Sequence, residues 1–163
     1  MANNLTPFDK RTTLLFISFS PYTPLRSKAL KYFKNAFNNN QNVEINEAFT
    51  EWPIYLSKSG NAKFILSPPG NGIDPHRNWE ALSMGAVPIV LNQSEFQSLF
   101  DDMPVMVVND WSEVTEANME KFIHERLTNN FSKDEIPWRP KLWLRYWLTK
   151  IMNAKFDYIK HNC

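Results

Sequence analysis

Ser67-Pro-Pro-Gly-Asn-Gly-Ile-Asp-Pro-His-Arg-Asn-Trp-Glu-Ala-Leu-Ser-Met-Gly-Ala-Val-Pro-Ile-Val-Leu91 is the stretch of sequence that decides how this chain folds. It contains Gly70, Gly72 and Gly85, whereas the whole chain has only 4 glycines. Glycine permits backbone angles and close approaches that other residues do not. The pattern predicts a tight loop after a strand, a helix over 75–84, and then a buried strand.

Apolar runs alternate with amphipathic stretches along the rest of the chain. We expect strands over 12–19, 43–47, 63–67, 87–91 and 105–108, and helices over 24–38, 50–59, 75–84, 112–129 and 141–158. This alternation predicts an α/β fold, a three-layer Rossmann-like sandwich with a mainly parallel sheet. At 163 residues the chain is expected to be a single domain over 1–163, with a flexible segment over 1–11 and a Trp-rich C-terminal helix over 141–158.

The bulk composition excludes several classes of protein. Lys and Arg number 18 against 17 Asp and Glu, a formal net charge of +1, so charge does not favour a nucleic-acid partner. The single cysteine, Cys163, excludes an internal disulfide. Because no secretory signal and no run of about 20 apolar residues occurs, we expect a soluble, cytoplasmic chain as written. A longer, membrane-anchored precursor remains an alternative.

The loop at 67–77 follows a predicted strand, and ligands of open α/β sheets bind beyond the carboxyl ends of the strands. Asp74 is expected to cap the next helix, with Pro75 in its first position. Free amides of that first turn, together with the helix dipole, favour a negatively charged ligand. Arg77 can hold a diphosphate bidentately, and Glu80, one turn further on, can accept hydrogen bonds from ribose hydroxyls.

Simpler interpretations of the same residues stay open. Asp74 can be a cap alone, and Arg77 with Glu80 can be a surface ion pair. His76 can contact phosphates or carry a proton, or it can be an ordinary first-turn residue. The acidic pair Asp101-Asp102 is expected to lie in a solvated loop, and we predict no metal site.

The spacing Gly-x-Gly-x-Asp-x-x-Arg-x-x-Glu, followed by Gly-x-x-Pro-Ile-Val, is more specific than any of its parts. The segment 63–91 that carries it resembles the donor-binding half of exostosin-like glycosyltransferases of the GT-B type. In that family a small-residue loop leads into an Arg-x-x-Glu or Arg-x-x-Asp helix, followed by Gly, two residues and Pro-Val or Pro-Ile. Weaker similarity extends to Leu99-Phe-Asp-Asp-Met-Pro-Val105, Val107-Val-Asn-Asp-Trp111 and Tyr146-Trp147, and the strand over 14–19 with Arg26 after it resembles the start of the same domain.

The resemblance implies a glycosyltransferase, a hexosyl- or pentosyltransferase, that moves a sugar from a nucleotide-sugar donor to a hydroxyl acceptor such as a glycan. It implies metal-independent chemistry and no cofactor besides the donor substrate. The implied donor- and phosphate-binding residues are Gly70, Asn71, Gly72, Asp74, His76, Arg77 and Arg26, with Glu80 at the ribose and His76 as the candidate catalytic residue.

A complete GT-B enzyme has two domains, whereas this chain has room for one. The chain is therefore a stand-alone domain, a split enzyme or a degenerate relic. The alternative function is a catalytically inactive nucleotide-sugar-binding or assembly module that needs a partner N-terminal domain.

The predicted C-terminal helix bears on that choice. Trp143, Trp147 and Ile151 recur at every fourth position, and basic residues are interleaved with them. We expect this apolar stripe to pack on the domain's own core. The alternative is that it faces a partner domain or a membrane surface.

Overall fold

Five parallel strands form one sheet in the order β2-β1-β3-β4-β5. The structure is a computed structural model that describes residues 5–48, 50–93, 98–127, 136–137 and 139–162. The strands are β1 (Thr13–Ser18), β2 (Val43–Asn46), β3 (Ala62–Leu66), β4 (Val87–Leu91) and β5 (Met106–Val108). All of them run parallel, as the alternating sequence pattern predicts.

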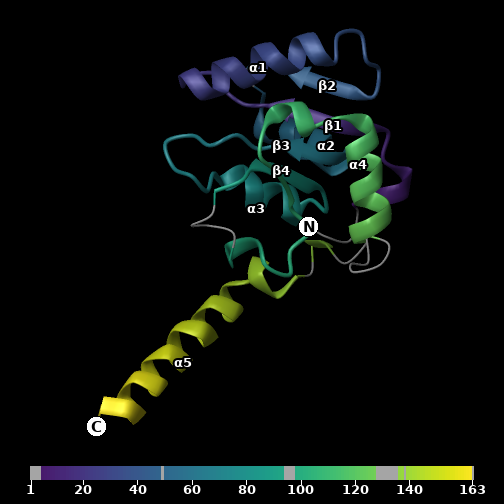
Figure 1. Cartoon of the computed structure of the whole chain (residues 1–163). Helices are drawn as coiled ribbons and strands as arrows, with labels where there is room; N and C mark the ends of the chain where they lie inside the picture. Colours follow the sequence, from purple (N-terminus) through teal and green to yellow (C-terminus); the bar gives the residue numbers. More distant parts are fainter. Residues whose placement is uncertain (1–4, 49, 94–97, 128–135, 138, 163) are drawn as a thin grey trace.

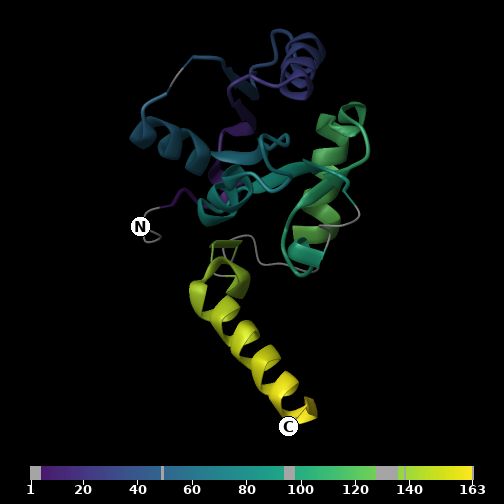
Figure 2. The same ribbon diagram turned by 90° about the vertical axis from the view of Figure 1, so that its left-hand side faces the viewer.

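Helices cover both faces of this sheet and complete the predicted three-layer α/β sandwich (Figure 1). The longer helices of the body are α1 (Pro24–Ala36), α2 (Trp52–Asn61), α3 (His76–Ser83) and α4 (Glu116–Phe122). Viewed along the edge of the sheet, α1 and α4 lie on one side and α2 on the other (Figure 2). Short helical turns, η2 (Phe8–Lys10), η4 (Trp111–Glu113), the π-helical η5 (Ile123–Leu127) and η7 (Pro140–Leu142), fill the connections.

The central strand β1 shows why the sheet needs helices on both sides. Leu15, Phe16 and Ile17 are all fully buried. Leu15 and Ile17 belong to the core beneath α1 and α4, whereas Phe16 joins the smaller core that includes Tyr55 of α2. Successive side chains of a strand point to opposite faces, so a continuous apolar run requires cover on both.

The strand order creates a switch point between β1 and β3. The chain leaves β1 toward β2 on one side of it and then returns to β3 on the other side. The loops that follow β1 and β3 therefore diverge at the carboxyl edge of the sheet, which is where open α/β sheets bind ligands. Thr23 fixes the end of the first loop, because its Oγ1 accepts from the amide of Arg26, 3.2 Å away, and caps α1.

The described part of the N-terminal segment packs against the body of the domain. Phe8 is buried in the larger core, and the guanidinium of Arg11 donates to the carbonyls of Thr6, Ala62 and Met84 over 2.8–3.0 Å. A buried cation needs such partners, and here they tie the segment to β3 and to the end of α3. The described part of 1–11 thus has contacts with the body, and the flexibility of the segment stays a prediction.

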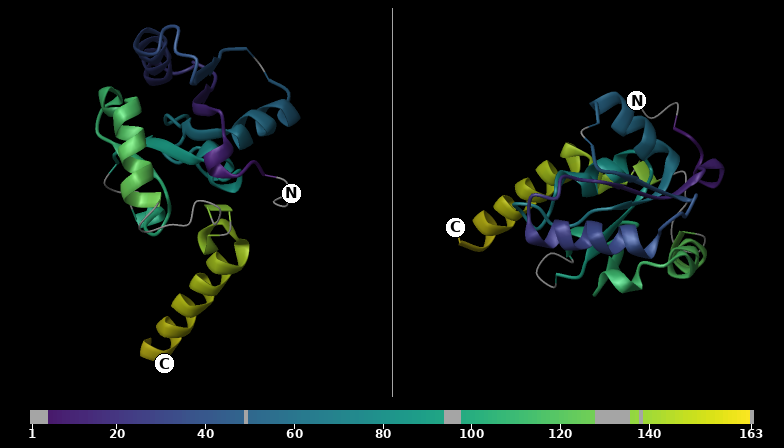
Figure 3. Two further views of the ribbon diagram at one scale, coloured as in Figure 1. Left: turned by 90° about the vertical axis from the view of Figure 1, so that its right-hand side faces the viewer. Right: turned by 90° about the horizontal axis from the view of Figure 1, so that it is seen from above.

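The C-terminal helix α5 (Leu144–Asn162) projects away from the body (Figures 1–3). Leu144 is 72% exposed and Ile151 65% exposed, so the expected packing on the domain's own core is wrong. The start of α5 is nevertheless held: Lys141 Nζ donates to the carbonyl of Asp101, 2.5 Å away, and Trp147 Nε1 donates to the carbonyl of Lys141, 2.8 Å away. Within the described ranges, the length and apolar character needed to cross a lipid bilayer are found in no helix.

Candidate functional site

A cavity of about 370 Å³ lies where the loops after β1 and β3 meet the start of α3. We call it the loop cavity. Its lining residues are Tyr22, Arg26, Gly70, Asn71, Gly72, Asp74, Pro75, His76, Arg77 and Glu80. The structure thus brings every site residue named from the sequence to one cavity, and their binding of a ligand stays a prediction.

A second cavity, of about 480 Å³, adjoins the first. We call it the aromatic cavity. It is lined by Ser18, Phe19, Ser20, Asn46, Glu47, Ala48, Thr50, Trp52, Tyr55, Arg77 and Glu80. Because Arg77 and Glu80 line both cavities, these two side chains stand at the boundary of one bipartite site.

Sequence reasoning missed the aromatic cavity. Its walls come from the ends of β1 and β2, from α2 and from α3, which are brought together only by the strand order. The available signal was the pair Trp52 and Tyr55, two aromatic residues three positions apart at the start of a helix that follows a strand.

The beginning of α3 differs from the prediction in a way that matters for the site. The Asp74 carboxylate accepts from Asn78 Nδ2 at 2.9 Å and from Trp79 Nε1 at 2.8 Å, so the expected capping role is wrong. Pro75 occupies the N-cap position, and no side chain caps the helix. The amide of Asn78 donates to the carbonyl of Pro75 over 3.0 Å, whereas no side chain of the helix start competes for the amides of His76 and Arg77 beside the loop cavity.

Arg77 is the cation that both cavities share. Its Nε is buried and has no hydrogen-bond partner within the described part of the chain, and its guanidinium carbon lies 5.9 Å from the ring centroid of Phe19. No described carboxylate forms an ion pair with it. A guanidinium held without an anionic partner favours binding of a phosphate or carboxylate group from a ligand.

Glu80 is occupied by a partner other than Arg77. Tyr55 Oη donates to Glu80 Oε2 over 3.0 Å, so the alternative of a surface ion pair between Arg77 and Glu80 is wrong. Burial, opposed by the positive charge of Arg77 and reinforced by Glu80, raises the pKa of Tyr55 to about 12. The phenol therefore stays protonated near neutral pH and orients the carboxylate, whose other oxygen can accept from ligand hydroxyls.

Arg26 adds a second positive charge and supports the loop. It is only 6% exposed. Its Nε donates to the carbonyl of Pro69, 3.0 Å away, and its Nη2 to that of Pro68, 3.3 Å away. Burial, together with the nearby charge of Arg77, lowers the pKa of Arg26. The residue predicted to bind phosphate thus first braces the loop, and its charge adds to the positive potential at the cavity.

Gly70 and Gly72 differ in the space that surrounds them. A Cβ on Gly70 would lie 2.6 Å from Arg26 Nη2 and 2.8 Å from Tyr22 Oη, so a side chain there would displace the bracing arginine. A Cβ on Gly72 would meet nothing within 4 Å. The backbone at Gly72 therefore faces open space in the cavity, beside the exposed residues Asn71 and His76.

The polar groups that line the two cavities are of the kinds that suit an anion and a polyol. Among the described residues, no group of three His, Cys, Asp or Glu side chains is placed to hold a metal ion. Asp101 and Asp102 are both exposed in a turn, as expected. The available donors are amides and guanidinium groups, and Glu80 supplies one oriented carboxylate as an acceptor.

Comparison with known proteins adds no assignment, because no protein-family model matches this sequence and no curated protein sequence is significantly similar to it. The resemblance to exostosin-like enzymes therefore rests on the sequence motifs alone, chiefly the one at 63–91.

Proposed function

We propose that this chain is the donor-binding domain of a glycosyltransferase that resembles the exostosin-like GT-B enzymes. The observation that carries the proposal is the position of Arg77 and Glu80 at the boundary of two adjoining cavities beyond the carboxyl ends of the parallel strands. An unpaired guanidinium beside free helix amides suits a diphosphate. An oriented carboxylate one helical turn away suits the hydroxyls of a ribose.

In this proposal the residues act by binding and by stabilising charge. Arg77 and the first-turn amides of α3 hold the diphosphate and stabilise the negative charge that develops when the sugar–phosphate bond breaks. Glu80 orients the ribose, and Tyr55 fixes the carboxylate. The sugar passes from the diphosphate to an acceptor hydroxyl, whose proton is taken by a base. His76 is the candidate for that base within the loop cavity.

Calorimetric titration of the whole chain tests the binding step. We expect saturable binding of at least one member of a panel of uridine, guanosine, adenosine and cytidine diphosphates and their sugars, without added metal. Adenosine and the other nucleosides, which lack phosphate, are the controls and should bind much more weakly. If folded protein binds no member of the panel, the proposal is refuted for this chain.

The second candidate function is a catalytically inactive binding or assembly module. It is favoured by α5, whose apolar side chains Leu144, Ile151 and Phe156 are exposed along a projecting helix. This module would bind nucleotide sugar but neither transfer nor hydrolyse it, and would use Trp143 and Ile151 to contact a partner domain or a membrane surface. Release of free sugar from a bound donor, followed by NMR, discriminates the two functions. Release that depends on His76 supports the enzyme.

A further inference from the structure

The aromatic cavity contains a tryptophan that the fold does not need for its core. Trp52 is 55% exposed at the start of α2, yet it lines a cavity of about 480 Å³. One face of its indole packs against Tyr55, with ring centroids 5.5 Å apart and planes 23° apart. An open aromatic face in a concave site is suited to stacking against a planar ring.

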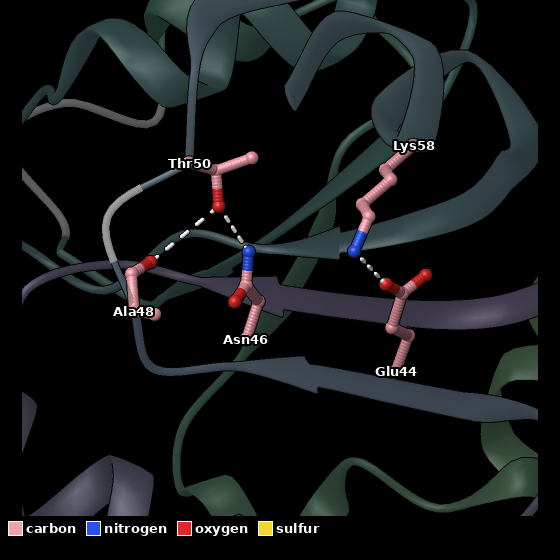
Figure 4. A network of polar contacts seen from close by, with 5 residues as sticks. All are labelled: Glu44, Asn46, Ala48, Thr50 and Lys58. Carbon is pink, nitrogen blue, oxygen red and sulfur yellow. Dashed lines mark hydrogen bonds and ion pairs between the residues drawn. The ribbon is translucent and has the colours of Figure 1, made fainter. Parts of the chain in front are cut away.

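The stacking partner of Trp52 is itself held rigidly. Tyr55 is 8% exposed and packs on Phe16 with the ring centroids 6.0 Å apart, and its hydroxyl donates to Glu80. The last turn of α2 is also tied to the sheet, because Lys58 of α2 forms an ion pair with Glu44 of β2 at 2.5 Å (Figure 4). The ring against which the indole of Trp52 stacks is therefore held in place by the fold.

A polar side chain also lines the aromatic cavity. Asn46, at the carboxyl end of β2, donates from Nδ2 to Thr50 Oγ1, and this hydroxyl donates in turn to the carbonyl of Ala48, 3.4 Å away (Figure 4). Within the described residues, Asn46 Oδ1 makes no hydrogen bond. The network thus fixes an amide whose oxygen is available to accept a hydrogen bond from the edge of a ring.

We propose that Trp52 is the stacking surface for the planar base of a nucleotide, and that Asn46 Oδ1 accepts a hydrogen bond from the edge of that base. The inference rests on the proposed function and extends it. Contacts lead from Glu80 to Tyr55 and from Tyr55 to Trp52, and Arg77 lines both cavities together with Glu80. These groups can therefore be matched to the ribose, base and diphosphate of one nucleoside diphosphate. Stacking on an aromatic side chain tolerates any base, and the single acceptor of Asn46 adds a modest preference.

The test compares inorganic pyrophosphate with uridine, guanosine, adenosine and cytidine diphosphates by calorimetry on the full chain. Wild type should bind at least one nucleoside diphosphate more tightly than pyrophosphate. Trp52→Ala should weaken binding of that nucleotide by about 5- to 150-fold, which is the range for one base stack. The affinity for pyrophosphate should not change. Trp52→Phe, which keeps a stacking ring, should recover most of the affinity.

Trp143→Ala is the matched control, because Trp143 is similarly exposed but lies outside both cavities. It should change neither affinity, and thermal unfolding should show that each variant is folded. If wild type binds pyrophosphate and nucleotide equally, or if Trp52→Ala weakens neither, the base site is refuted while the diphosphate site stands. An oligosaccharide titrated in parallel separates a glycan site from a base site: if Trp52→Ala weakens binding of the oligosaccharide and not of the nucleotide, the proposal is overturned. Failure of wild type to bind any of these ligands refutes the proposed function itself.

Discussion

Replacing Arg77 by alanine tests whether this arginine serves ligand binding or folding. A structural arginine would lose stability on substitution, whereas a ligand-binding one should leave the free energy of unfolding almost unchanged. The buried Nε of Arg77 has no hydrogen-bond partner in the described chain, and an unsatisfied buried donor costs about 1–3 kcal/mol. Arg77→Ala removes that cost and the repulsion from Arg26. It also removes half-buried methylenes near Phe19, each worth about 0.8 kcal/mol when fully buried. These contributions offset one another, so the free energy of unfolding should change by no more than about 1 kcal/mol.

The same substitution should strongly weaken binding of a diphosphate. A hydrogen bond to a charged group contributes about 1.5–3 kcal/mol, and a tenfold change in affinity corresponds to about 1.4 kcal/mol. Loss of one such contact raises the dissociation constant about 10- to 150-fold, and loss of a bidentate pair raises it further. Arg77→Lys should fall between wild type and Arg77→Ala, because it keeps the charge but not the planar fork.

Arg11→Lys is the matched control, since Arg11 is a buried arginine far from both cavities. Lysine cannot reproduce the three hydrogen bonds of the guanidinium, and losing two of them should cost about 3 kcal/mol of stability without changing ligand affinity. Urea unfolding and calorimetry on the same preparations give both quantities. The reasoning is refuted if Arg77→Ala binds diphosphate as wild type does, or if it loses as much stability as the Arg11 variant.

Three further predictions concern the fold around the site. Burial raises the pKa of Tyr55 from 10.0 to about 12. The contribution of Tyr55 to stability is therefore complete below pH 10 and is lost as the pH rises toward 12. An absorbance titration should show one tyrosine that ionises late, and Tyr55→Phe should remove that step. Hydrogen bonds from Ser112 lower the pKa of Asp110. Wild type should therefore be more stable than Asp110→Ala at neutral pH, and this difference should shrink on acidification below about pH 4. A difference that grows in acid would contradict this reasoning. Gly85 has a φ of 70°, and a Cβ there would lie 2.7 Å from Arg11 Nη2. Gly85→Ala should therefore lower the free energy of unfolding by about 1–3 kcal/mol. An unchanged midpoint of urea unfolding would contradict this.

The sheet could be predicted because its signal is local. Phe64, Ile65 and Leu66 form a short apolar run bounded by polar and loop residues, and burial on both faces requires such a run. The clustering of the candidate site residues could also be predicted, because Gly70 to Glu80 is one continuous segment. Its residues share a cavity through the geometry of one loop and one helix.

Other parts could not be predicted because they depend on contacts between distant residues. Thr50 resembles a helix cap, but its hydroxyl interacts with Asn46 and Ala48 instead, and α2 begins without a side-chain cap. Gly60 resembles a helix terminator, yet it lies inside α2, where a Cβ would be 3.1 Å from Met84 Cε. Amphipathic spacing in α5 likewise shows which face is apolar but not what covers it.

Hydrogen-bond accounting distinguishes three arginines that look alike in the sequence. All three side-chain nitrogens of Arg11 donate to backbone carbonyls. Two nitrogens of Arg26 do so, whereas none of those of Arg77 donates to a described residue. The N–H groups of a guanidinium near a protein surface donate hydrogen bonds. Where the chain supplies no acceptor, the acceptor comes from solvent or from a ligand. Arg77 is the member of this series that lines two cavities, so in the proposed complex ligand oxygen atoms would take the place that carbonyls occupy around Arg11.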